Sequence, residues 1–428
     1  MINLSTLSTI CSIIILIFNL IMILLNKKTF LNFFLRFKKK TITLLLVIII
    51  MSAIINFTAP HFHRWYTDEP NSLEKSKTII TNEEYSQIKY RHPIGWSLLL
   101  TIPFLILGLK TNIALYFTSI LGFITVINIF GITFILTKKI RISLFSAFIY
   151  SLIPIIIKYS GTATNNVPSN FFLTLTIFVM LISYKQESKK KNLLTASLIA
   201  LSSLFRTENY FLFVYYFIGQ FLLNRKKRIS AINISLLMIA FIITVPNLMN
   251  NFYLYFDDSL AKGNMGSENV DNWSLKNLSE KQDFTKELFS NSIHPFFFSL
   301  LWITGILFGI KSNKKETMFL LAYIIPIIIV FSIYFYESSR YFITIYPFII
   351  ILSTLSLDFI INRFNNKKQI IYVLIIIFVI TFLPYIKRVN ADVWIPHSLE
   401  TIIPDLLEQD LKKDCIIIAI MPTVLKAT

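Results

Sequence analysis

Long apolar runs, separated by short polar connections, make up most of this chain. The runs at 42–57 and 370–385 contain no charged residue, and with their flanking residues they reach the length that a helix needs to cross a bilayer. A helix pairs every backbone polar group within its own segment, so it is the structure expected for such runs in lipid. The pattern predicts twelve spans, near 4–25, 41–58, 112–136, 143–159, 168–184, 192–206, 208–223, 229–249, 293–310, 317–335, 340–361 and 369–386.

Basic residues follow every second predicted span. The clusters after the first, third, fifth, seventh, ninth and eleventh spans are Lys27, Lys28, Arg36 and 38–40; Lys138, Lys139 and Arg141; Lys185 and 189–191; 225–228; Lys311, Lys314 and Lys315; and Arg363, Lys367 and Lys368. Basic connections remain on the cytoplasmic side of a membrane. The remaining connections, including the long ones at 59–111 and 250–292, are therefore predicted to lie on the outer side of the plasma membrane.

One apolar segment, 94–109, interrupts this alternation. If it crossed the membrane, every later basic connection would face outward, against the usual charge distribution. We therefore expect a juxtamembrane helix that lies at the outer surface or dips into it. The fold class expected is an all-α polytopic membrane bundle of about twelve spans with this helix in the first large outer loop.

Composition supports a membrane protein and excludes some partners. The chain of 428 residues is 55% hydrophobic and only 15% charged, far less charged than a soluble domain. The net charge of +18 lies in the short basic connections and sets orientation, so we expect no nucleic-acid partner. The two cysteines, Cys11 and Cys415, have no metal-ligand spacing.

Adjacent carboxylates follow the second predicted span, in the sequence Tyr66-Thr67-Asp68-Glu69. A carboxylate at the membrane surface is a candidate general base, although an arbitrary Asp-Glu pair is more often part of a solvated loop. The aromatic and basic neighbours favour a site here, with Asp68 and Glu69 as catalytic candidates and Tyr66 as a substrate-binding candidate.

Two isolated arginines are predicted at the outer boundary, against the usual distribution of positive charge. They are Arg206, followed closely by Glu208, and Arg340, followed by Tyr341. A guanidinium grips phosphate through a fork of donors; the alternative is an interface arginine paired with a nearby glutamate. Both arginines are candidates for binding phosphate, and Glu208 and Tyr341 for binding substrate.

Two further outer segments carry polar residues. In Tyr90-Arg91-His92-Pro93, the His-Pro step begins the expected juxtamembrane helix, with proline in its first turn. His92 is a candidate for phosphate binding and Arg91 for substrate binding, whereas His92 lacks a second ligand at metal-binding spacing. The small polar residues of 161–168 suit close approach of a ligand, or a plain turn between two helices.

These segments, in this order and on one side, resemble the GT-C glycosyltransferases, in particular the dolichyl-phosphate-mannose protein mannosyltransferase-like superfamily. The resemblance rests on Asp68-Glu69, on His92-Pro93, on the loop 161–168, on Arg206 and on Arg340-Tyr341. It extends over most of the chain from Asn56 to Met421. Asn165 and Asn166 stand where several relatives have an acid, which argues against a metal-dependent mechanism; no cofactor is expected, with a divalent metal left open.

The resemblance implies a membrane glycosyltransferase that moves a hexosyl or pentosyl group from a polyprenyl-phosphate donor to an acceptor at the outer face. It implies inversion at the anomeric carbon, with Asp68 as the base. The acceptor would be a lipid, a glycan or a protein of the cell envelope, and the sequence specifies neither the sugar nor the acceptor.

Two alternative functions remain at this level. The first is a lipid or solute transporter or flippase, although transporters place polar groups at the bilayer midplane and show internal repeats. The second is an inactive scaffold subunit with the same fold.

The sequence also predicts a division into two parts. Residues 1–390 form the transmembrane domain. Residues 391–428 resemble the beginning of an outer α/β domain, apparently truncated, with an amphipathic helix at 399–411 followed by a strand at 415–420.

Overall fold

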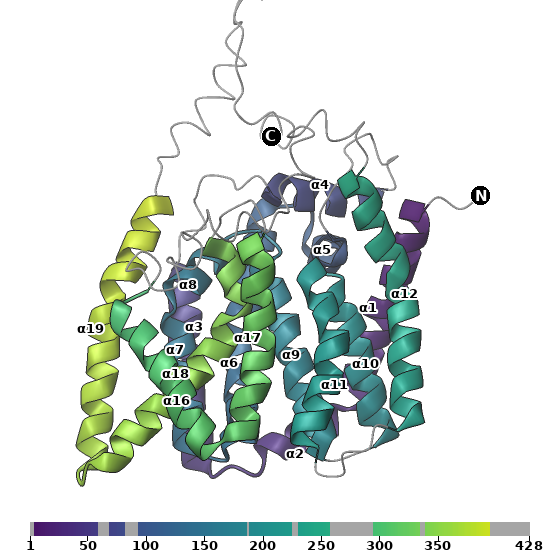
Figure 1. Ribbon diagram of the computed structural model, residues 1–428. Coiled ribbons are helices and arrows are strands. Elements are labelled where there is room, and N and C mark those ends of the chain that lie inside the picture. Colours follow the sequence, from purple (N-terminus) through teal and green to yellow (C-terminus); the bar gives the residue numbers. More distant parts are fainter. Residues whose placement is uncertain are drawn as a thin grey trace, which may run out of the picture.

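The computed structural model shows a bundle of long, roughly parallel helices (Figure 1). It describes residues 4–58, 68–81, 93–185, 188–224, 230–256, 294–333 and 339–393. The predicted outer α/β domain at 391–428 lies almost entirely outside these residues, as do the residues from 59 to 67 and from 82 to 92.

The helices are numbered as in Figure 1. Their bounds are α1 Leu4–Leu25, α2 Lys27–Phe34, α3 Lys39–Thr58, α4 Asp68–Thr81, α5 Gly95–Leu107, α6 Thr111–Thr137, α7 Ile140–Leu152, α8 Pro154–Ser160, α9 Asn166–Lys185, α10 Lys189–Ser203, η1 Thr207–Tyr210, α11 Phe211–Leu223, α12 Ala231–Phe256, α16 Phe296–Ser312, α17 Lys314–Ile333, η3 Ser339–Thr344, α18 Tyr346–Arg363 and α19 Lys367–Val393.

The predicted helical membrane fold is confirmed. Among the described residues, eight helices are long and apolar enough to cross a membrane, and nine if the bent pair α7 and α8, with 59° between its halves, forms one span. Each of the twelve predicted ranges overlaps a helix, but α10, α11 and α16 are shorter, at 15, 13 and 17 residues. The predicted start of one span at residue 340 is wrong: residues 339–344 form a 3-10 helix, and α18 begins at Tyr346 with Pro347 in its first turn.

Burial separates the helices into an inner and an outer group. The apolar windows of α9 and α18 are 89% and 72% buried, whereas those of α3 and α19 are only 22% and 11% buried. Large apolar side chains such as Ile50 and Ile380 are therefore exposed on the outer helices. This arrangement is typical of an integral membrane protein, in which the exposed apolar surface contacts lipid.

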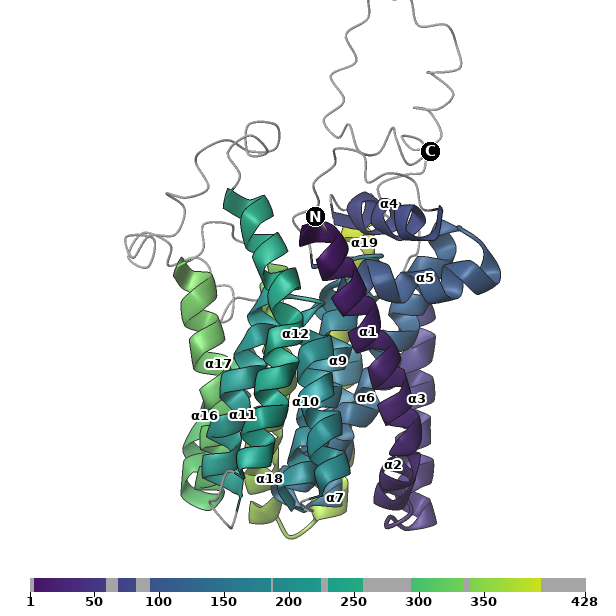
Figure 2. The same cartoon turned by 90° about the vertical axis from the view of Figure 1, so that its right-hand side faces the viewer.

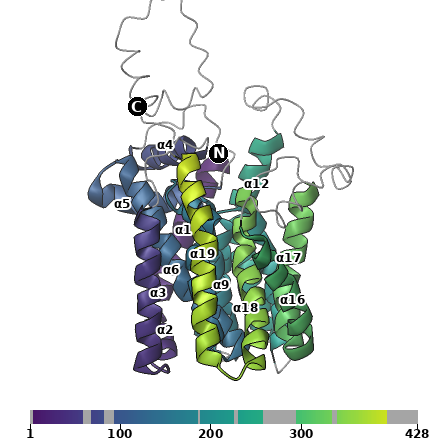
Figure 3. The ribbon, with the colours of Figure 1, turned by 90° about the vertical axis from the view of Figure 1, so that its left-hand side faces the viewer.

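The two ends of the bundle differ in what connects the helices. At one end, which we call the α4 end, α4 and α5 lie across the tops of the vertical helices, whereas α2 and the basic connections lie at the opposite, basic end (Figures 1 and 2). Figure 3 shows the connection between α18 and α19 at the basic end as well. The basic clusters of the sequence that fall in described connections thus share one end.

Helix α5 does not cross the bundle, as the sequence predicts for 94–109. The preceding α3 ends, and the following α6 begins, at the α4 end, where α5 itself lies (Figures 2 and 3). The first half of α5 is buried, including Trp96, whereas Leu105 and Ile106 near its end are 69% and 76% exposed. The helix ends at Gly108, whose φ of 89° is a conformation that side chains disfavour.

We expect single cysteines at Lys77 and Lys110, on a background with Cys11 and Cys415 changed to serine, to react from the same side of the membrane. Lys77 is exposed on α4 and Lys110 precedes α6, so both lie at the α4 end. A cysteine at Lys39, at the basic end, should react only from the other side. Labelling of intact cells with a membrane-impermeant thiol reagent measures this. Reaction of Lys77→Cys and Lys39→Cys from one side would contradict the topology, and the side on which Lys77→Cys reacts gives the orientation.

Candidate functional site

Glu69 lies in the first turn of α4 and is completely buried, with 0% of its surface exposed. Its Oε1 atom accepts a hydrogen bond from the backbone N–H of Ala163, with a distance of 2.6 Å. A buried carboxylate requires such partners, because burial without them is costly. Glu69 therefore fastens the start of α4 to the connection between α8 and α9.

Trp96, in the first turn of α5, hydrogen-bonds the backbone of the same residue, Ala163. Its Nε1–H donates to the carbonyl oxygen of Ala163 over 2.6 Å, and its ring stacks on Phe117 of α6 with 5.9 Å between centroids. The two polar backbone atoms of Ala163 are thus held by two residues from different sequence motifs. Three segments that the sequence singles out separately, near residues 69, 96 and 163, therefore meet at Ala163.

The start of α5 also packs tightly against the end of α10. The Gly95 N–H donates to the Leu204 carbonyl over 2.8 Å. A Cβ atom at residue 95 would lie 2.5 Å from that same oxygen, which is backbone and cannot rotate away. Only glycine fits here, and the contact fixes α5 next to the turn that presents Arg206.

Arg206 is held by side chains on both sides of its guanidinium. Its Nε donates to Glu208 and its Nη1 to Asn166 at the start of α9. The residue is only 9% exposed, and its Cζ lies 5.4 Å from the ring centroid of Tyr341. In the described part of the chain no hydrogen bond engages the Nη2 atom of Arg206.

Tyr341 brings the second arginine to the same place. The Cζ of Arg340 lies 5.5 Å from the centroid of the Tyr341 ring, which also stacks on Phe331 at 4.5 Å. Both guanidiniums are within cation–π range of one ring. Arg206 and Arg340, which are more than 130 residues apart in sequence, therefore both lie near the Tyr341 ring at the α4 end.

The two asparagines of the second outer loop are already engaged. Asn165 donates through Nδ2 to the Phe205 carbonyl over 3.0 Å, and the Oδ1 of Asn166 accepts from Arg206. Within the described ranges, no three His, Cys, Asp or Glu residues are grouped closely enough to hold a metal ion. The amide of Asn165 thus binds backbone, and that of Asn166 binds the arginine.

Several candidates from the sequence cannot be placed. Tyr66, Arg91 and His92 lie outside the described residues, and for Asp68 only the backbone is described, as the first residue of α4. The backbone of Asp68 therefore lies next to the buried Glu69, at the start of α4.

Two buried residues at this end were not singled out by the sequence pattern. One is His294, whose Nδ1 and Nε2 lie 2.7 Å from the Tyr346 hydroxyl and 2.9 Å from the Ser299 hydroxyl. It forms a second His-Pro step with Pro295, and that repetition is the signal that could have identified it. Both ring nitrogens are engaged, so His294 joins the starts of α16 and α18.

The other is Lys75, on the face of α4 that packs against α5. Ser76 beside it donates to the Ser97 carbonyl over 2.9 Å. Burial lowers the pKa of Lys75 to about 8, because desolvation disfavours the charged form. The spacing of Glu69, Ser72 and Ser76 along α4 could have identified this buried face.

We expect Lys75→Met to stabilise the protein at pH 7. The folded-state pKa is about 8 and the model-compound value is 10.5, so the unfolded state binds more protons between these values and stability rises with pH across that window. The full penalty, about 3 kcal/mol, applies below pH 8. Thermal unfolding between pH 7 and 10 should show a higher melting temperature and a flatter pH profile for Lys75→Met. Lys77→Met, on the exposed side of α4, serves as the control; equal profiles for wild type and Lys75→Met would contradict this prediction.

Comparisons with known proteins give a match to one family over part of the chain. Residues 91–249 match the family model of the dolichyl-phosphate-mannose-protein mannosyltransferases. This segment contains the start of α5, the 161–168 loop and Arg206. A search of curated proteins found no match.

Solved structures share the fold. The oligosaccharyltransferase of Archaeoglobus fulgidus in its apo form superposes with a TM-score of 0.57 at 12% identity, over 83% of this chain and 56% of that chain. The same protein, AglB, has been solved with an inhibitory peptide and a dolichol-phosphate, at a TM-score of 0.57 and 11% identity, with the same two coverages. ArnT from Cupriavidus metallidurans, bound to undecaprenyl phosphate, gives a TM-score of 0.52 at 13% identity, over 74% of this chain and 60% of that chain.

This chain thus spans a little over half the length of the structures that it matches. At these identities the likeness establishes the fold, and the matched segment adds a relation in sequence. Both findings agree with the resemblance that the motifs indicate: this chain is an integral membrane protein with the fold of the AglB and ArnT structures, and its residues 91–249 are similar to the dolichyl-phosphate-mannose-protein mannosyltransferases.

Proposed function

We propose that this protein is an inverting glycosyltransferase that moves a sugar from a polyprenyl-phosphate donor to an acceptor at the α4 end of the bundle. We further propose that this end is on the outer side of the membrane. The related structures contain dolichol-phosphate and undecaprenyl phosphate, which supports a lipid-phosphate donor for this chain. Nucleotide sugars are cytosolic, so a transferase on the outer side requires a donor delivered through the membrane.

One observation carries the proposal: the motifs for acid and phosphate chemistry are joined into one unit at one end. Glu69 and Trp96 hydrogen-bond the backbone N–H and C=O of Ala163. The Gly95 N–H donates to the carbonyl of Leu204, two residues before Arg206. A general base and a phosphate-binding cation must be held at fixed separation to act on one glycosyl bond. The network supplies that rigidity.

In the proposed reaction, the acceptor hydroxyl gives its proton to the carboxylate of Asp68. The acceptor oxygen forms a bond to the anomeric carbon from the face opposite the donor oxygen. The bond between the anomeric carbon and that oxygen breaks, and its electron pair leaves with the polyprenyl phosphate. Direct displacement of this kind inverts the configuration of the anomeric carbon.

The negative charge that grows on the departing phosphate would be balanced by Arg206 and Arg340. A fixed cation in a poorly hydrated site stabilises such charge more than one in water. Glu208 and Asn166 hold the Arg206 guanidinium in place, so it does not need to reorient during the reaction. We assign His92 to the same phosphate, and Tyr66, Arg91, Glu208 and Tyr341 to substrate binding.

We assign Glu69 a positioning role rather than the proton transfer. Its carboxylate is fully buried and accepts the Ala163 N–H, which leaves it poorly placed to reach an acceptor. By anchoring the first turn of α4, it would fix the backbone that presents Asp68.

Sugar transfer by the purified protein tests the proposal. The full chain, reconstituted in lipid, would be given a radiolabelled synthetic polyprenyl-phosphate sugar and a mixed acceptor fraction from the cell envelope, with and without a chelator. We expect label in the acceptor and release of polyprenyl phosphate, both unaffected by the chelator. Movement of the donor across the bilayer without bond cleavage would instead indicate a flippase, and neither activity would indicate a scaffold.

A further inference from the structure

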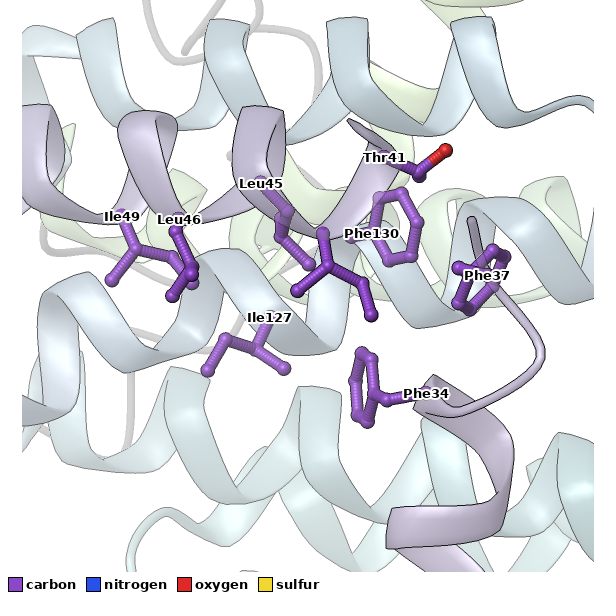
Figure 4. A pocket seen from close by; sticks show the side chains of 9 residues that line it. Phe34, Phe37, Thr41, Leu45, Leu46, Ile49, Ile127 and Phe130 are labelled. Carbon is purple, nitrogen blue, oxygen red and sulfur yellow. The ribbon is translucent and has the colours of Figure 1, made fainter. Parts of the chain in front are cut away.

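An apolar groove lies at the basic end, on the opposite side of the bundle from the candidate site. It has a volume of about 180 Å³ and lies between the α2–α3 connection, α3 and α6 (Figure 4). The lining residues are Phe34, Phe37, Thr41, Ile42, Leu45, Leu46, Ile49, Ile127 and Phe130. An apolar cavity of comparable size, about 150 Å³, remains dry and accepts hydrocarbon.

The groove follows the axis of α3 and opens to the side. On α3 the lining runs from Thr41 to Ile49, and eight residues of helix correspond to roughly 12 Å. Leu46 lines it and is nevertheless 51% exposed, on an outer helix whose surface contacts lipid. A linear hydrocarbon chain that enters from the bilayer would fit this shape.

Four basic residues are close in sequence to Phe37 and Thr41, at one end of the groove. Arg36, Lys38, Lys39 and Lys40 lie directly beside these two residues in sequence, and all four are exposed. Burial and then the charge of Arg36 lower the pKa of Lys191 on α10, so a fifth cation lies within electrostatic range of Arg36. Among the described residues no carboxylate forms an ion pair with the first four, so the charge at this end is not neutralised by a described acid.

From this geometry we infer a lipid site: the groove binds one acyl chain of an anionic phospholipid, and the cations at 36–40 bind its headgroup phosphate. A basic pocket at the membrane boundary attracts anionic headgroups. The hydrocarbon chain gains dispersion energy when it packs closely against the apolar side chains of the groove. The site is separate from the proposed donor site and does not depend on the sugar-transfer activity.

Native mass spectrometry of the full chain tests this inference. The protein would be extracted from nanodiscs that contain equal amounts of phosphatidylglycerol and phosphatidylcholine, with chains of equal length. We expect one retained phosphatidylglycerol per protein, in clear excess over phosphatidylcholine. Equal retention of the two lipids would overturn the proposal, and so would displacement by polyprenyl phosphate at low concentration, which would assign the groove to the donor.

Two pairs of matched variants separate charge from shape. The triple variant Lys38→Gln, Lys39→Gln and Lys40→Gln should reduce retained phosphatidylglycerol on the order of tenfold. The control triple Lys311→Gln, Lys314→Gln and Lys315→Gln, also exposed at the basic end, should retain it. Equal losses in both triples would indicate bulk attraction to the membrane and no site.

The second pair changes the groove itself. Ile49→Phe fills the groove and should lower the amount of phosphatidylglycerol retained. Ile50 is 58% exposed and not part of the lining, so Ile50→Phe should retain the lipid. Phosphatidylglycerol with a photoreactive group in its acyl chain gives a measurement on the wild type that does not depend on the folding of any variant. Crosslinks should fall on α3 and α6 within the lining; crosslinks spread over the outer helices would overturn the assignment.

Discussion

Asp68→Asn should lower the rate of sugar transfer by about 100-fold or more. Asparagine has the size of aspartate but does not take up the proton of the acceptor hydroxyl, so the attacking oxygen is not activated. The loss corresponds to a barrier higher by about 2.7 kcal/mol. Single-turnover transfer with radiolabelled donor measures the chemical step directly.

Two controls make this result specific to the base. Glu74→Gln changes a half-buried carboxylate on the same helix and should transfer at nearly the wild-type rate. Donor binding should be unchanged in Asp68→Asn, because the proposed base faces the acceptor. A wild-type rate in a folded Asp68→Asn protein would remove Asp68 from the mechanism.

Glu69 is the residue most easily confused with Asp68, and its environment separates the two. In Glu69→Gln, the side-chain oxygen still accepts the Ala163 N–H, so the anchor is largely kept and the rate should fall less than in Asp68→Asn. Glu69→Ala removes the anchor and leaves that N–H unsatisfied in a buried position. A catalytic Glu69 would show the reverse order, with Glu69→Gln as damaging as Glu69→Ala.

The membrane fold could be predicted from the sequence because its physical basis is local. Apolar runs and the alternating basic connections determine spans and sidedness without knowledge of any contact. The same reasoning predicted that 94–109 does not cross, and α5 indeed lies at the α4 end of the bundle (Figure 2). It failed at the start of α18. The sequence pattern predicts that the span containing this helix begins at residue 340, but residues 339–344 form a 3-10 helix before Pro347.

The candidate site could be predicted only as separate pieces. Sequence order places Glu69, Trp96 and Ala163 tens of residues apart, and nothing local indicates that the backbone of Ala163 bonds both of the other side chains. The cation–π contacts of both arginines with Tyr341 depend likewise on the packing of η3 against α9. Lys75 was missed because lysine is rarely buried, and only the burial of its helix face in the structure reveals it.

Arg206→Lys and Arg340→Lys should each weaken binding of the polyprenyl-phosphate donor by about tenfold and lower the transfer rate by a further 10- to 100-fold. Lysine keeps the positive charge but replaces a planar fork with a single ammonium, which does not reproduce two parallel bonds to phosphate. Donor affinity measured by titration, together with single-turnover rates, separates the two effects.

The competing interpretation is that each arginine is structural. Arg206 already bonds Glu208 and Asn166, and a lysine at that position could still pair with Glu208, so a purely structural role predicts near-normal donor binding. Arg363→Lys provides the matched control, because Arg363 also lies over an aromatic ring, at 4.9 Å from the centroid of Phe359, but at the basic end. It should bind donor like the wild type.

The pattern across these variants decides the role of the pair. If Arg206 and Arg340 grip the same phosphate, their effects are coupled, and the double variant should lose less than the product of the two single losses. If each arginine only packs on Tyr341, then Tyr341→Phe, which keeps the ring, should leave folding and donor binding intact. Arg206→Lys and Arg340→Lys should then also fold and bind donor like the wild type. Donor binding that survives both Arg206→Lys and Arg340→Lys would leave the phosphate to Arg64, Arg91 and His92. Arg64 precedes α4 in sequence, and Arg91 and His92 precede α5.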